Sequence, residues 1–220
     1  MLKVWLDDPL DHKYLIQNML PHASFKGVPS IHDADIAIMR GTADLPPNYY
    51  NQTPLQGVVG NRSQIELFDW VWERSAHCVR VGIGSAAHYL NLKGGGDIIQ
   101  KVDNHDKDHL MEVEGQPGRK IWVTSRHNSQ MLPGSDATEL AYVSERNKFM
   151  STMKYTDKLA WRRESSLPQS VYWKDAEVVW YNDIKSLCWQ PDFLVGTGAN
   201  QYQFFAEVLE AIMEKQKCAA

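Results

Sequence analysis

The chain has 220 residues, a formal net charge of −4 at pH 7 and 43% hydrophobic residues, including 8 Trp. This length and composition suit one large core, and we expect a single domain over residues 1–220. The negative net charge argues against a nucleic-acid partner, and the lack of any apolar run of about 18 residues argues against a membrane span.

The first half of the chain alternates strand and helix patterns. Apolar periodicity predicts, in order, a strand at 2–6, a helix at 11–19, a strand at 34–39, a helix at 61–75, a strand at 78–83 and a helix at 85–92. Asn61 is a suitable N-cap for the second helix. The strand at 78–83 is apolar except for Arg80, which is typical of a strand buried on both faces of a parallel sheet. This order predicts a parallel sheet with right-handed crossovers.

The second half has a different pattern. It predicts, in order, a polar loop at 102–114, strands at 120–124 and 139–143, a variable insertion at 148–170, strands at 171–173, 177–181 and 186–190, and an amphipathic helix at 201–215. Together the two halves predict an α/β protein. We expect a three-layer α/β/α fold with a mostly parallel central sheet and a smaller antiparallel β portion.

The cysteines point to a reducing environment. Cys78, Cys188 and Cys218 are odd in number, lie far apart and form no C-x-x-C motif. This pattern predicts free thiols in the cytoplasm rather than disulfides or structural zinc, and we expect no cofactor.

The stretch from residue 79 to residue 100 organises the rest of the chain. It predicts a strand, a tight turn at Gly84 and Ser85, a helix and a glycine-rich exit. In α/β proteins, a turn of this kind at the carboxyl end of a strand commonly carries a nucleophile. Here the turn contains no cysteine.

Several separated segments, in the same order, resemble the class I glutamine amidotransferases, with the stand-alone γ-glutamyl hydrolase (peptidase C26) type as the nearest match. Residues 35–50 resemble the family's strand and Gly-Gly-x-Asp-x-x-Pro-x-x-Tyr loop. Residues 81–100 resemble its elbow, Gly-Ile-Cys-Arg-Gly-x-Gln-x-Leu-Asn-x-x-x-Gly-Gly. Residues 123–131 resemble its Asn-Ser-x-His-His-Gln segment, and 177–192 resemble the strand pair that ends in Gln-x-His-Pro-Glu. The resemblance implies a flavodoxin-like, glutamine-amidotransferase-like fold.

The same resemblance implies that the catalytic residues are lost. The family's nucleophilic Cys falls on Gly84, its catalytic His on Asp192 and its Glu on Leu194, while its Gly-Gly pair becomes Arg40-Gly41. Amide hydrolysis by this route needs a nucleophile and a base within hydrogen-bond reach. We therefore expect an inactive protein that serves as a binding or structural subunit, with a protein partner or a second copy. Members of this branch occur in phage genomes, so a virion or another large assembly is included in that expectation.

An alternative is a divergent amidotransferase or γ-glutamyl amide hydrolase with a non-standard nucleophile. Ser85 and His88 are three residues apart and would lie within one helical turn, so they could form a substitute dyad. The simpler interpretation is that Ser85 caps the helix that begins there. In either case Gly41, Ser85, His127 and Gln130 are candidates to bind a glutamine or γ-glutamyl ligand, although His127 also suits a structural role.

Two further segments allow two interpretations each. His105 and His109 are four residues apart, and a helix would place both imidazoles on one face, where they could bind a divalent metal. A solvated polar loop is the alternative, and we predict no metal site. The basic segment at 148–163, which also carries aromatic residues, is either a docking surface for an acidic partner or a solvated insertion.

Overall fold

The structure is a computed structural model. It describes residues 1–7, 18, 25–54, 58, 60–100, 108–126, 129–143, 176–193 and 197–219. The helix expected at 11–19 (except Asn18), the insertion at 148–170 and the strand at 171–173 lie outside the described residues. Those expectations stay predictions.

A nine-stranded mixed sheet forms the centre of the protein, with strand order β2-β1-β3-β4-β11-β10-β9-β6-β7. Its strands are β1 (Leu2–Leu6), β2 (Phe25–Gly27), β3 (Ile36–Gly41), β4 (Val79–Gly84), β6 (His109–Val113), β7 (Lys120–Val123), β9 (Ala137–Val143), β10 (Ala176–Tyr181) and β11 (Ser186–Trp189). Strands β2, β1, β3, β4 and β11 pair in parallel, and β10, β9, β6 and β7 extend the sheet with antiparallel pairs. A separate antiparallel pair joins β5 (Asp97–Ile99) to β8 (Gln130–Leu132).

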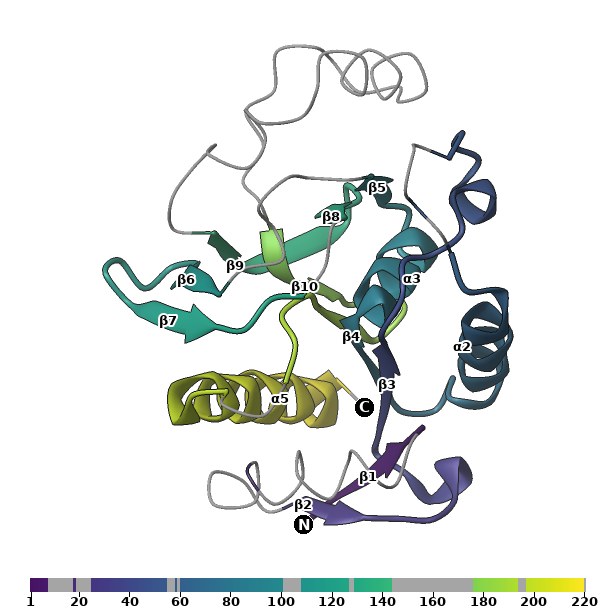
Figure 1. Cartoon of the computed structure of the whole chain (residues 1–220). Coiled ribbons are helices and arrows are strands. Elements are labelled where there is room, and N and C mark those ends of the chain that lie inside the picture. The colour runs from purple at the N-terminus through teal and green to yellow at the C-terminus, as the bar shows by residue number, and fades with distance from the viewer. Residues whose placement is uncertain are drawn as a thin grey trace.

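Helices cover both faces of this sheet, which confirms the predicted three-layer α/β/α fold. Figure 1 shows α2 (Arg62–Arg74) and α3 (Ser85–Lys93) on one side of the parallel strands and α5 (Ala199–Ala219) on the other. Two short 3-10 helices, η1 (Ile31–Asp33) and η2 (Pro47–Tyr50), lie between strands of the first half. In the described part of the chain, no helix is both long and apolar enough to cross a membrane.

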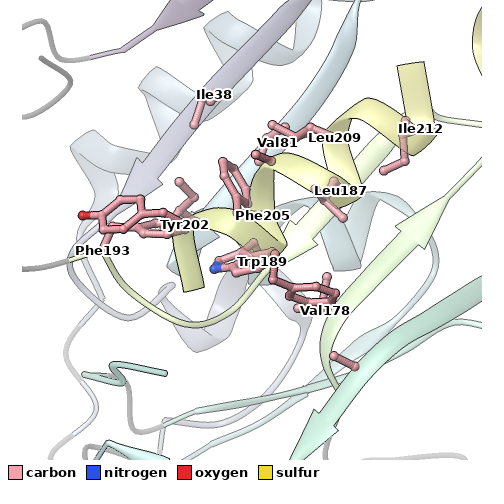
Figure 2. Close-up of a cluster of buried hydrophobic side chains, with 14 of the residues drawn as sticks. Ile38, Val81, Val178, Leu187, Trp189, Phe193, Tyr202, Phe205, Leu209 and Ile212 are labelled. Carbon is pink, nitrogen blue, oxygen red and sulfur yellow. The ribbon is translucent and has the colours of Figure 1, made fainter. Parts of the chain in front are cut away.

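The α5 side of the core is built around Trp189 at the end of β11 (Figure 2). Its ring is fully buried and lies 4.7 Å from the Phe205 ring of α5 and 5.7 Å from the Phe193 ring, measured between centroids. Burial of aromatic side chains is among the largest contributions to a core, so this cluster holds α5 and the segment after β11 against the sheet. The segment so held contains Asp192.

One prediction in the second half of the chain is wrong. Residues 102–114 were expected to form a polar loop, but the described part of that range contains β6. His109, Met111 and Val113 point inward, while Leu110 and Glu112 alternate with them on the other face. Strand alternation therefore turns a charged segment into a half-buried strand. The three-residue strands β2, β5 and β8 were also not predicted, because such short strands leave no periodic signal.

Helix α2 begins where the sequence places its N-cap. The Asn61 side-chain oxygen accepts a hydrogen bond from the Ser63 backbone N–H at 3.0 Å. Asn61→Ala should lower the free energy of unfolding by about 1 kcal/mol, because one N–H at the start of the helix then loses its partner. Urea denaturation would measure this loss. Ser63→Ala is the matched control, since it keeps the capping bond and should change stability by less than about 0.5 kcal/mol.

Candidate functional site

The turn between β4 and α3 has the backbone geometry of a strained elbow. Gly84 is the N-cap of α3, with φ of 61° and ψ of −128°. Residues other than glycine adopt such a left-handed φ only at an energetic cost. A Cβ atom at this position would lie 2.6 Å from the Gly41 carbonyl oxygen and 3.2 Å from Asp192 Oδ1. The space that a nucleophilic side chain would need is therefore lined by a backbone carbonyl and a carboxylate.

Strand pairing explains why these residues meet. Gly41 ends β3 and is the register partner of Gly84 at the end of β4, and the parallel neighbour β11 leads into Asp192. Carboxyl ends of parallel strands lie at one edge of a sheet, which is where α/β proteins commonly place their sites. A Cβ atom on Gly41 would overlap Ser85 Oγ, so β3 packs directly on the start of α3.

Asp192 is the group at this edge that titrates closest to neutral pH. Its side chain is only 7% exposed, and its backbone is fixed by a hydrogen bond from its N–H to the Thr124 carbonyl at 2.8 Å. Burial raises the pKa of Asp192 to about 6, while the charges of Arg40 and Arg126 and a hydrogen bond from the Arg126 backbone N–H act in the opposite direction. Asp192 can therefore exchange a proton near neutral pH, but the residue it faces has no side chain.

The predicted Ser85 and His88 pair is divided between different partners. Ser85 Oγ accepts a hydrogen bond from Gln64 Nε2 at 2.8 Å. Burial lowers the pKa of His88 to about 4, opposed by the charge of Asp44 and by a hydrogen bond with the Gln190 side chain. His88 is thus neutral at pH 7 and a weak base. The expectation that Ser85 is the helix cap is wrong, since Gly84 holds that position and Ser85 is the first residue of the helix.

Gln130 lies in a buried amide network behind the elbow. Its Nε2 donates to the Ala176 carbonyl at 2.9 Å, and its Oε1 accepts from Gln190 Nε2 at 3.1 Å. Gln190 Oε1 in turn accepts from the Met131 backbone N–H at 3.0 Å. These bonds connect β8 to the end of β11, beside His88. Ligand binding by Gln130 stays a prediction, and it would require this buried network to rearrange.

The remaining predicted site residues fall into two groups. His127, Leu194 and His105 lie outside the described residues. His109 is described, and it lies on a strand rather than on a helix or in a solvated loop. Its Nε2 is 3.5 Å from Oε1 of the fully buried Glu177, so the two expectations for His109 are both wrong. Among the described residues, no group of three or more His, Cys, Asp or Glu side chains could hold a metal ion.

The buried pair of His109 and Glu177 was missed from the sequence. Glu177 was assigned to a strand, and a charged residue within the apolar run at 176–181 was the one available signal. The rarity of fully buried carboxylates without a partner predicts a partner for it. The sequence does not identify that partner, because β10 and β6 are brought together only through β9.

Comparisons with known proteins identify the fold. No protein-family model matches the sequence, and no curated protein matches it. A solved structure of a candidate GMP synthase component from Thermoplasma acidophilum is similar, with a TM-score of 0.59, 14% identity, and coverage of 99% of this chain and 96% of that one. PurLQS from Thermotoga maritima gives a TM-score of 0.52 and 12% identity, with coverage of 96% and 100%.

A glutamine amidotransferase from Thermotoga maritima gives a TM-score of 0.51 and 10% identity, with coverage of 98% of this chain and 85% of that one. Identities this low carry information on architecture and none on activity. The chain therefore has the three-layer α/β fold that is seen in glutamine amidotransferases.

Proposed function

We propose that this protein is a non-catalytic relative of the class I glutamine amidotransferases and acts as a binding or structural subunit of a protein assembly. One observation carries the proposal. The elbow keeps its strained backbone at Gly84, while the Gly41 carbonyl occupies the position next to any side chain there, at 2.6 Å from a Cβ atom.

The chemistry of the surrounding groups supports the same conclusion. Gly84 offers no nucleophile, and Asp192, which faces it, can only exchange a proton. The nearby hydroxyl of Ser85 accepts a bond from an amide, and an amide does not act as a general base. The loss of a nucleophile or of its base typically lowers the rate by several powers of ten.

A structural need explains why the turn persists without chemistry. β4 is buried along its whole length, and α3 begins at the next residue. The chain must reverse within one residue there, and glycine does so at the lowest cost. The similar protein from Thermoplasma acidophilum is named as a subunit, which gives modest support to a protein partner for this chain. A virion is one assembly that fits the proposal.

Assays of glutaminase and γ-glutamyl hydrolase activity test the proposal. We expect the purified protein to release no ammonia from glutamine and no glutamate from γ-glutamyl peptides above the rate without protein. Release that disappears in Ser85→Ala or His88→Ala would contradict the proposal and support the alternative hydrolase with a substitute dyad. Both residues are buried, so circular dichroism of each variant must first confirm that it folds.

A ligand at the elbow is compatible with a binding role. Arg40, Arg126 and Asp192 bring charges of both signs to this edge, as a zwitterionic amino acid would require. Glutamine or a γ-glutamyl compound that binds the native state would raise the melting temperature as its concentration rises. No change across such a panel would restrict the binding role to protein partners.

A further inference from the structure

The antiparallel end of the sheet has one covered face and one outward face. Alternate residues of β6, β7 and β9 join the hydrophobic cluster beneath α5: Met111, Val113, Ile121, Val123 and Ala141. The residues between them point to the opposite side. We call this opposite side the outward face; it comprises Leu110, Glu112, Lys120, Trp122 and Tyr142.

Trp122 is unusually exposed for its residue type. Its side chain is 55% exposed, compared with 41% for Trp70 on α2. At the other end of the sheet, α2 and α3 pack on the cluster that contains Ala37, Met39 and Val179. Neither helix reaches β7, the terminal strand of the sheet (Figure 1). An exposed Trp beside other apolar residues marks a contact surface, because Trp is strongly enriched in protein interfaces.

The strand register makes this face complementary to itself. Leu110 of β6 lies directly opposite Trp122 of β7, and Glu112 lies directly opposite Lys120. Consider a two-fold axis that runs parallel to the strands, midway between β6 and β7, just above the outward face. It exchanges the β6 and β7 positions between two copies. Each Trp122 then lies over a Leu110 of the other copy, and each Lys120 lies over a Glu112.

We propose that the outward face of β6, β7 and β9 binds a second copy of this chain, in a two-fold dimer with the two sheets stacked face to face. Stacked sheets lie about 10 Å apart, a distance that Trp and Leu side chains fill. A self-complementary patch is the requirement for a closed two-fold interface. The Lys–Glu contacts set the orientation, and the apolar contacts remove the exposed indole from water.

This inference names a partner for the proposed binding role and rests on that proposal only in expecting a protein partner. Sedimentation equilibrium of the full chain over a range of concentrations tests it. The wild-type protein should form dimers. Trp122→Ser should raise the dimer dissociation constant by at least about tenfold, as for a central interface Trp. Trp70→Ser is the matched control, because it removes an exposed Trp from α2, and it should leave the constant unchanged.

A charge-reversal experiment distinguishes the interface from effects within one chain. Lys120→Glu places a new carboxylate over Glu112 of the other copy, and Glu112→Lys places a new ammonium group over Lys120 of the other copy. Each single variant alone should dimerise at least about tenfold more weakly than the wild type. An equimolar mixture of the two should recover dimers, because both contacts between the copies become oppositely charged. The like charges within each chain remain in the mixture, so an effect inside the chain predicts no recovery.

Several outcomes overturn the proposal: a wild-type protein that stays monomeric, a Trp122→Ser variant that dimerises as well as the wild type, or a mixture that recovers nothing. A monomer without amidase activity would leave the proposed function intact with a different protein as partner. A dimer with amidase activity would overturn the proposed function and leave this interface standing.

Discussion

Gly84→Ala should lower the free energy of unfolding by about 3 kcal/mol, as the sum of two costs. The first is the φ of 61°, which places a Cβ atom close to the following carbonyl. The second is the packing against β3, because the new Cβ would lie 2.6 Å from the Gly41 carbonyl oxygen and the strand would have to shift. Urea denaturation of the variant and the wild type measures the total.

Gly95→Ala separates the two costs. Gly95 also has a positive φ, of 80°, but no atom lies within 4 Å of the point that a Cβ on this residue would occupy. This variant should lose only the conformational part, about 1 to 2 kcal/mol. Equal losses for the two variants would mean that the elbow has room for a side chain, and the structural argument for a non-catalytic elbow would fail.

Gly84→Cys extends the same reasoning to activity. It should be destabilised like the alanine variant, and it should show no glutaminase activity. The thiol would face Asp192 rather than a histidine, and an acid with a pKa of about 6 is a weaker base for a thiol than a histidine held by a carboxylate. Ammonia release by Gly84→Cys would show that the nucleophile alone had been missing.

Much of the fold could be predicted from the sequence. The apolar run before Gly84 and the Asn61 cap predicted β4 and α2 nearly to the residue, because a buried parallel strand and a capped amphipathic helix have strong local signals. The His-rich segment misled because its inward residues include His109, whose burial depends on Glu177, 68 positions away. Local patterns do not contain such a partner.

The candidate site could be predicted only in part. Strand ends placed Gly84 and Asp192 at one edge, and the structure brings them together. The separation of Ser85 from His88 depends on Gln64 and Gln190, which come from α2 and from the end of β11. The spacing of three residues on a helix allows a dyad but does not choose between partners. Those partners are set by packing between distant segments.

Asp192→Asn should change how stability depends on pH, and this is the second large effect that we expect. The pKa of Asp192 is raised by burial to about 6, from an ordinary value of 3.8. The native state therefore binds this proton more tightly than the unfolded state. The stability that the proton contributes is fully present below about pH 4 and is lost as the pH rises through 6. A difference of about two pKa units corresponds to about 3 kcal/mol at pH 7.

The asparagine variant has no such proton, so the comparison isolates one group. The difference in unfolding free energy, variant minus wild type, should increase by about 3 kcal/mol between pH 4 and pH 7, with its steepest change near pH 6. Other titrating groups contribute equally to both proteins and cancel. A difference that stays constant with pH would show that Arg40 and Arg126 fully compensate for burial. Asp192 would then be a stable carboxylate, and the elbow would present a permanent negative charge to any partner or ligand.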